Sequence, residues 1–270
     1  MLALIAGQGR LPVCLAERLA ARGAPFVICE MRGFPTAATG APLLRFRIEH
    51  LGTLLDDLRA RGVDEICLAG AVRRPEVDEG ALDSATRPLA PRIARAIASG
   101  DDAALRIILE IFEERGFAIR AAHEIAPELL PPAGIPTRAC PADNHRRDVC
   151  LADAALARLG AADIGQACVV AAGRVVATEG PQGTDAMLAA LPGAARGGFL
   201  AKAPKPGQER RADLPTIGPG TVAAAARAGL AGIVIEAGGV LVLERDEVIG
   251  ACDDAGLFLW LREAGPCTSS

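Results

Sequence analysis

The chain has 270 residues, of which 51% are hydrophobic, and its formal net charge is −4. This length favours two domains of roughly 100–200 residues each. The acidic balance argues against a general nucleic-acid binder, which needs a basic surplus to meet phosphates. No apolar run approaches the roughly 20 residues of a membrane-spanning helix.

Eight cysteines are scattered along the chain without a C-x-x-C pair. We therefore expect reduced, mostly buried thiols and no zinc site, as is usual in the cytosol. The first residues are typical of a strand rather than of a signal peptide, because no basic stretch precedes them. The sequence predicts a cytoplasmic protein and leaves contact with a membrane surface open.

Strand-like and helix-like segments alternate in the N-terminal half. We predict strands over 2–6, 26–29, 65–69 and 117–121, and helices over 11–22, 51–61, 89–98 and 101–115. Asp101 is a natural N-cap for the last of these helices. The alternation indicates the α/β class, with a mostly parallel sheet in an N-terminal domain over residues 1–125.

Residues 126–145 interrupt this pattern with five prolines, so we interpret them as a linker. A C-terminal domain is expected over 146–270. Its predicted helices begin near 147, 185, 221 and 246, and its predicted strands cover 167–171, 174–178, 233–236, 240–243 and 257–261.

A glycine-rich turn follows the first predicted strand and opens a helix. Gly7, Gln8 and Gly9 would expose backbone N–H groups at the positive helix terminus, which favours phosphate. The dinucleotide pattern G-x-G-x-x-G fails, because Pro12 stands where the third glycine belongs. A tight turn with no ligand is an equally good interpretation.

A second glycine turn follows the predicted strand over 65–69. Ligands of open α/β sheets bind outside the carboxyl ends of strands. Arg73 and Arg74, just beyond Gly70, would meet a phosphate or carboxylate there, and solvated surface arginines are the alternative.

A loop between a strand and a helix carries Glu179, Thr184 and Asp185. Thr184 or Asp185 would cap the helix, and the glycines between them and Glu179 allow a ligand to approach the backbone. Glu179 and Asp185 also offer hard oxygen ligands of the kind that Mg²⁺ prefers, although their spacing is not diagnostic.

The strongest segment contains the chain's only two lysines. Lys202 and Lys205 are followed closely by Arg210, Arg211 and Asp213, among prolines and glycines that disfavour a helix or a central strand. Four cations around one carboxylate would keep Asp213 ionised, which suits a metal ligand or a water-orienting group. Lysines together with Mg²⁺ would neutralise the negative charge on the non-bridging oxygens of a phosphoanhydride while water attacks it. A charged surface loop is the plainer alternative.

Histidine chemistry has weaker support. His50, His123 and His145 are far apart and form no recognisable catalytic order. His123 follows a predicted strand and would face a cleft, but a structural histidine explains it equally well.

Taken together, these segments resemble the UDP-2,3-diacylglucosamine pyrophosphatase family of lipid A biosynthesis, in the form that is unrelated to metallophosphoesterases. The similarity extends over nearly the whole chain, and its most specific parts are residues 183–188 and 200–218. It implies a Rossmann-like N-terminal domain, a smaller C-terminal α/β domain and a substrate enclosed between them. It also implies Mg²⁺-dependent hydrolysis to UMP and 2,3-diacylglucosamine 1-phosphate.

The resemblance also implies roles for particular residues. Asp213 matches the aspartate regarded as catalytic, with Lys202 and Lys205 beside it, and the predicted metal ligands are Asp213, Glu179 and Asp185. The predicted substrate-binding residues are Gly7, Gln8, Gly9, Gly70, Arg74, Asp101, His123, Thr184, Asp185, Met187, Gln208 and Arg210. Gln182 and Ala71 depart from the family pattern. The first departure argues against a metal-binding role near Gln182, and the second argues against one ligand contact near Ala71.

Partners and alternatives follow from the same interpretation. The two acyl chains of such a substrate predict an apolar cleft between domains and weak peripheral contact with the inner membrane, since no polybasic cluster is present. No nucleic-acid partner is expected, and the number of subunits stays open, with a homo-oligomer among the alternatives. Two rival functions are a nucleotide-sugar transferase or phosphatase, and a lipid or nucleotide carrier without catalysis.

Overall fold

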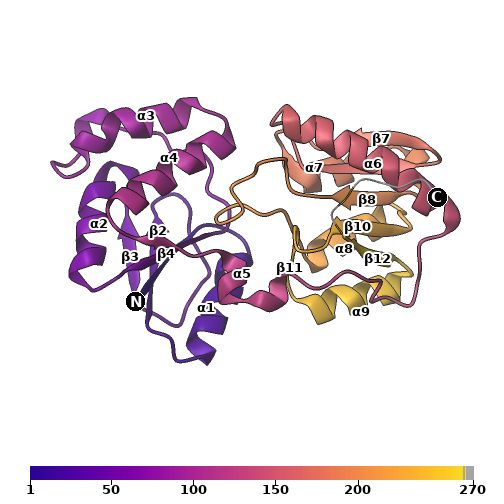
Figure 1. Cartoon of the computed structure of the whole chain (residues 1–270), viewed down its shortest axis with the longest axis horizontal. Coiled ribbons are helices and arrows are strands. Elements are labelled where there is room, and N and C mark those ends of the chain that lie inside the picture. The colour runs from indigo at the N-terminus through magenta and orange to yellow at the C-terminus, as the bar shows by residue number, and fades with distance from the viewer. Residues whose placement is uncertain (264, 266–270) are drawn as a thin grey trace. The chain divides into compact units, whose positions relative to one another are not determined.

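The computed structural model describes residues 1–263 and residue 265. The chain forms two compact units, each a sheet with helices on its faces (Figure 1). Unit 1 comprises residues 1–127 and 209–213, and unit 2 comprises residues 128–208 and the described residues from Leu214 onward. The two units use similar lengths of chain, so the C-terminal one is not the smaller of the two, contrary to expectation.

The sheet of unit 1 is built from five parallel strands. They are β1 (Leu2–Ala6), β2 (Phe26–Met31), β3 (Leu43–Phe46), β4 (Glu65–Ala69) and β5 (Ala118–Ile119). Their order is β3-β2-β1-β4-β5, and every neighbouring pair is parallel. The order reverses between β1 and β4, which is the switch point where open α/β sheets bind ligands. The α/β class and the parallel sheet are confirmed.

Helices cover both faces of this sheet. They are α1 (Leu11–Ala21), α2 (Leu51–Ala60), α3 (Ala90–Ala98), α4 (Asp101–Glu114) and α5 (Ala122–Ile125). Figure 1 shows α2, α3 and α4 on one side and α1 and α5 on the other. Alternate residues of a strand face opposite sides, and Ala3 and Ile5 accordingly join the apolar core under α2–α4. Gly100, not Asp101, is the N-cap of α4; Asp101 lies in the first turn, where a negative charge is favourable.

The predicted linker is for the most part packed on unit 2. Unit 1 ends at Pro127. Beyond it, the hydroxyl of Thr137 accepts the N–H of Leu259 at 3.0 Å, and the N–H of Arg138 donates to Asp253 at 2.7 Å. The prolines end regular structure here, but the backbone groups between them find partners in unit 2, so the segment is not free.

The main sheet of unit 2 is mixed. Its strands are β6 (Ala167–Ala171), β7 (Arg174–Thr178), β8 (Phe199–Lys202), β10 (Gly232–Glu236) and β12 (Phe258–Arg262), and a separate pair is β9 (Thr216–Ile217) with β11 (Leu241–Val242). The order is β12-β10-β8-β6-β7. Strands β8, β10 and β12 run parallel, and the β6–β7 hairpin joins antiparallel to β8. The start of β6 and the end of β7 therefore lie at the edge where β8 ends.

The helices of unit 2 divide between the two faces of the main sheet. They are α6 (Asp143–Ala161), α7 (Gly183–Ala189), α8 (Pro219–Arg227) and α9 (Arg245–Ala255). One apolar core joins the sheet to α7, α8 and α9, and a second joins it to α6. Single-turn 3₁₀ helices complete the described chain: η1 (Ile48–His50), η2 (Glu79–Ala81), η3 (Arg87–Leu89), η4 (Pro127–Leu129) and η5 (Gly193–Ala195). Within the described residues, no helix combines the length and the apolar character that crossing a membrane requires.

The cysteines are mostly as predicted. Among the described residues, six cysteines are free thiols, and four of these are buried: Cys29, Cys67, Cys168 and Cys252. Cys150 is disulfide-bonded, so the expectation of a fully reduced chain is wrong for this residue.

Candidate active site

Lys202 is the last residue of β8, and its side chain is buried. Its ammonium donates to the hydroxyl of Thr184 at 3.0 Å and to the carbonyl of Thr216 at 3.1 Å. A buried lysine keeps its charge only if acceptors replace the water that it loses. The alternation of β8 places Ala201 in the core under α6 and turns Lys202 toward the opposite face, where α7 supplies Thr184 and β9 supplies the carbonyl of Thr216.

The hydroxyl of Thr184 is itself oriented by Glu179. It donates to one carboxylate oxygen of Glu179 at 2.6 Å, and the N–H of Gln166 donates to the other oxygen at 2.6 Å. Because a hydroxyl carries one hydrogen, this bond turns a lone pair of Thr184 toward the Lys202 ammonium. Glu179 and Gln166 meet because the end of β7 and the start of β6 flank the end of β8.

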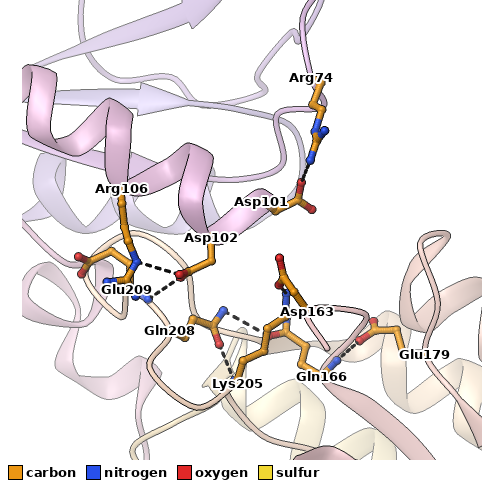
Figure 2. A network of polar contacts seen from close by, with 10 residues as sticks. All are labelled: Arg74, Asp101, Asp102, Arg106, Asp163, Gln166, Glu179, Lys205, Gln208 and Glu209. Atoms are coloured by element: carbon orange, nitrogen blue, oxygen red, sulfur yellow. Dashed lines mark hydrogen bonds and ion pairs between the residues drawn. The ribbon is translucent and has the colours of Figure 1, made fainter. Parts of the chain in front are cut away.

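Lys205 belongs to the same polar network. Its ammonium pairs with Asp163 at 2.6 Å, and its backbone N–H donates to the Gln208 side chain at 2.8 Å. Gln208, which is buried, donates to the Gln166 side chain at 3.3 Å. Figure 2 shows this connection from Lys205 through Gln208 and Gln166 to Glu179. The two lysines of the chain are thus joined through one set of hydrogen bonds in unit 2.

Asp213 lies in unit 1, at a cavity of about 390 Å³. Its side chain is half-buried, and its N–H donates to the carbonyl of Glu209 at 3.0 Å in a short turn. Apolar side chains from the carboxyl ends of the strands and from α3 and α4 line much of the wall, among them Ile5, Met31, Phe46, Leu68, Ile93, Ile108 and Phe112. A few polar groups at the wall of a largely apolar cavity are an arrangement typical of a ligand site.

Arg73, Arg74 and Asp101 also line this cavity. Arg74 donates to Asp101 at 2.9 Å and to the carbonyl of Ile97 at 3.1 Å (Figure 2). Both partners of the ion pair are largely exposed, so solvent screens it and a ligand phosphate would replace Asp101 at little cost. The predicted grouping of Arg74 and Asp101 near a ligand site is consistent with this position.

The four cations predicted around Asp213 are divided between the two units. Lys202 and Lys205 belong to unit 2, and Arg210 is exposed. Arg211 is engaged with Glu209 and Glu113.

The glycine turn after β1 is closed by the loop after β4. The N–H of Gly7 donates to Ala69 at 2.8 Å, and Gln8 and Ala71 exchange two backbone hydrogen bonds of 2.9 Å. A Cβ on Gly7 would lie 2.6 Å from the Ala71 carbonyl oxygen, so this residue must be glycine. The N–H groups of Gly7 and Gln8 are thus already used, which weakens the prediction that they bind phosphate. Gly9 is exposed.

The other predicted residues differ in position. Met187 is buried in the core of unit 2, where packing accounts for it. Asp185 is exposed in the first turn of α7. The Nδ1 atom of His123, on α5, is buried without a hydrogen-bond partner in the described chain. Gly70 has a φ of 87°, and a Cβ there would meet the Gln8 carbonyl oxygen at 2.6 Å, so a backbone requirement explains it.

The three predicted metal ligands do not converge within either unit. Among the described residues, no three His, Cys, Asp or Glu side chains form a group that would hold a metal ion. Both oxygens of Glu179 accept short hydrogen bonds, so its role is to orient Thr184. Mg²⁺ is commonly held by one or two carboxylates together with substrate phosphates. The half-buried Asp213 and the exposed Asp185 fit that pattern better than Glu179 does.

Sequence reasoning missed Asp163, Gln166 and Thr216 as parts of the lysine network, and Asp102 and Glu113 as partners of residues 209–213. Gln166 and Glu179 directly precede β6 and follow β7, so polar residues at strand ends were the available signal. The carbonyl of Thr216 and the partners on α4 left no local pattern in the sequence.

Comparisons with known proteins cover both units. The model of the LpxI N-terminal domain matches residues 1–129, and that of the LpxI C-terminal domain matches residues 132–260. The UDP-2,3-diacylglucosamine pyrophosphatase LpxI of Caulobacter vibrioides is 45% identical over 268 residues, which are 96% of each chain.

Proposed function

The chain belongs to the LpxI family, and from this premise we propose that it is a hydrolase that cleaves the diphosphate of UDP-2,3-diacylglucosamine in lipid A biosynthesis. The structural observation that carries the proposal is Asp213, a carboxylate at the wall of an apolar cavity. The products are UMP and 2,3-diacylglucosamine 1-phosphate. A carrier would need the cavity but has no evident need for the carboxylate.

Hydrolysis forms one phosphorus–oxygen bond to water and breaks the bond between phosphorus and the bridging oxygen. Little covalent chemistry is left to the protein, whose task is to position the water and to stabilise charge. Asp213 orients the water or accepts its proton. Lys202 stabilises charge on the non-bridging oxygens, and its burial makes that interaction stronger than it would be in water.

Lys205 acts with Lys202 on the diphosphate in this proposal. Its ammonium is held by Asp163, an ion pair in which the lysine side chain is only 15% exposed. A phosphate oxygen would compete with Asp163 for this ammonium, which can donate three hydrogen bonds.

Mg²⁺ is the proposed cofactor, with Asp213 as its protein ligand and Asp185 as a further candidate. When bound, the ion would polarise the diphosphate as a Lewis acid. Mg²⁺ keeps several waters and takes phosphate oxygens as ligands, so a site with few protein carboxylates is adequate.

The cavity of unit 1 is proposed to receive acyl carbon of the substrate. Its volume of about 390 Å³ and its aliphatic and aromatic walls suit hydrocarbon. Each methylene that leaves water contributes about 0.8 kcal/mol. Because the substrate resides in a bilayer, we also propose weak peripheral contact with the membrane surface.

Replacement of Asp213 by alanine tests the proposal. We expect Asp213→Ala to lower kcat by about 100-fold or more while substrate affinity changes little, since an oriented catalytic group acts mainly in the transition state. Release of UMP from UDP-2,3-diacylglucosamine, with ¹⁸O-labelled water to locate the attacked phosphorus, is the measurement. Asp246→Ala, an exposed aspartate on α9, is the matched control. A fully active Asp213→Ala enzyme contradicts the mechanism, and transfer of the sugar phosphate to an acceptor other than water contradicts hydrolysis.

A further inference from the structure

Residues 209–213, which we call the anchored segment, belong to unit 1 although the residues on either side belong to unit 2. The chain enters unit 1 after Gln208 and returns to unit 2 at Leu214. Ala212 packs against the apolar core of unit 1, and the N–H groups of Ala212 and Asp213 both donate to the carbonyl of Glu209. This short turn brings Asp213 to the cavity.

Asp102, in the first turn of α4, holds the beginning of the anchored segment. One of its oxygens accepts the backbone N–H of Glu209 at 3.0 Å, and the other accepts Arg106 at 2.8 Å (Figure 2). A carboxylate in this turn is favoured by the helix dipole. The Asp102 side chain is 27% exposed, so water competes only partly for these bonds.

Arg211 attaches the middle of the segment to the other end of α4. Its guanidinium donates to Glu113 at 2.6 Å and makes a two-pronged contact with Glu209 at 2.9 and 2.8 Å. The hydrogen bond from Arg211 is the largest cause that lowers the pKa of Glu209. The hydrogen bonds to Glu209 and then to Glu113 are the largest causes that raise the pKa of Arg211. Arg211 thus links Glu113 to Glu209, whose backbone N–H is also bound by Asp102. The segment is therefore attached to α4 at Asp102 and at Glu113, about three helical turns apart.

We propose that Asp102 and Glu113 are positioning residues for Asp213: by fastening the anchored segment to α4, they hold the carboxylate at the cavity of unit 1. The inference rests on the proposed function, in which Asp213 acts on the substrate. Neither residue contacts the reacting atoms in this scheme. A displacement of about 1 Å at a catalytic group is enough to cost up to about 100-fold in rate, so loosening the segment lowers kcat even where the fold is kept.

Limited proteolysis tests the anchoring without reference to activity. Trypsin cleaves after Arg210 and Arg211, and access to these bonds requires the segment to leave α4. We expect Asp102→Ala and Glu113→Gln to raise the cleavage rate there about tenfold, measured by mass spectrometry of the fragments. Glu110→Ala is the matched control, because Glu110 lies on α4 and pairs with Arg92 instead. Unchanged cleavage in both test variants overturns the proposal, even if Asp213 proves essential.

Kinetics then test the positioning. Asp102→Ala should lower kcat by about 10- to 100-fold, whereas Asp102→Asn, whose amide oxygen still accepts the Glu209 N–H, should recover most of that loss. The Glu113 side chain is exposed, so Glu113→Gln should fold normally and provides an independent variant. Wild-type kcat in both Asp102→Ala and Glu113→Gln overturns the proposal. If Asp213→Ala is fully active while cleavage rises as expected, the anchoring stands and the proposed catalytic role of Asp213 fails.

Discussion

The buried ammonium of Lys202 shows how single residues determine the chemistry of this protein. Apart from Lys205, every other strongly basic side chain is an arginine, whereas here the compact ammonium of Lys202 donates to a hydroxyl and to a backbone carbonyl. Thr184 satisfies both Lys202 and Glu179 through one oxygen atom. The position of the ammonium therefore depends on the hydroxyl of Thr184.

Replacing Thr184 by valine removes that hydroxyl and keeps the shape of the side chain. Lys202 and Glu179 each lose a partner while buried, so we expect stability to fall by about 1–3 kcal/mol and kcat to fall about tenfold as the ammonium shifts. Thr184→Ser keeps the hydroxyl and serves as the control. Urea denaturation and steady-state kinetics are the measurements, and a valine enzyme as active as the serine enzyme would exclude this role of Thr184.

The buried thiols make a second prediction at this scale. Burial raises the pKa of Cys29, Cys67 and Cys168 to about 12, and that of Cys252 to about 11. Because the thiolate is the reactive form, iodoacetamide at about pH 8 should label the exposed Cys140 and leave these four intact until the protein is unfolded. Mass spectrometry of peptides from folded and urea-treated protein checks this. Rapid labelling of Cys67 in the folded protein would show that the core of unit 1 opens readily.

At the scale of elements, the sequence predicts most but not all of the buried strands. Strand β8 was missed although it is buried and central in its sheet, so the expectation that the lysine segment avoids a central strand is wrong for Lys202. The predicted bounds of β1, β4, β6 and β7 match the structure, because continuous apolar runs end in glycine or charged residues. Strand β3 was missed: it lies at the sheet edge, and its pattern of exposed and buried residues gives no clear period. Strand β11 lies within the predicted strand over 240–243, whereas its partner β9 was not predicted, because it pairs only two residues and depends on this long-range contact.

Part of the candidate site was predictable for similar reasons. The concentration of both lysines in one segment correctly drew attention to residues 202–213. That segment was expected to be a single loop, but it divides between two units. Only Ala212 supplies an apolar contact to unit 1, and ion pairs between residues about 100 positions apart leave no periodic signal. The division therefore could not be predicted from the sequence.

Glu49 ties the loop after β4 to the start of α2, and this connection should depend on pH. A hydrogen bond from Arg47, supported by the N–H of Asp78, lowers the pKa of Glu49 from 4.5 to about 2. A carboxyl whose pKa is lower in the folded state stabilises fully above its unfolded pKa and loses that contribution as pH falls toward the folded value. We expect Glu49→Gln to cost about 1–2 kcal/mol near neutral pH and progressively less between about pH 5 and pH 2.

Denaturant titrations of both proteins over this pH range measure the difference. Asp56→Asn, which removes the exposed carboxylate of the pair between Asp56 and Arg115, is a control for loss of a surface ion pair. A constant difference between wild type and Glu49→Gln at all pH values would show that the carboxyl does not titrate with folding.

For the molecule as a whole, the candidate groups are shared between two units that have sheets of different design. The parallel sheet of unit 1 provides a cavity at the carboxyl ends of its strands, and the mixed sheet of unit 2 provides the lysine network at the edge where β8 ends. Three points of the chain, at residues 127–128, 208–209 and 213–214, pass from one unit to the other.

Filling the cavity should therefore separate recognition of the lipid from cleavage of the diphosphate. Ala104, on α4, lines the cavity, and Ala104→Phe would occupy space proposed for acyl carbon. Excluding two or three methylenes costs about 2 kcal/mol, so we expect KM for UDP-2,3-diacylglucosamine to rise about 30-fold. UDP-glucosamine has no acyl chains, so the variant and the wild type should hydrolyse it at the same slow rate. Ala103→Phe, on the exposed face of the same helix, controls for the added ring. If Ala104→Phe leaves KM for the diacyl substrate unchanged, the acyl chains bind elsewhere, and the apolar cavity of unit 1 needs another explanation.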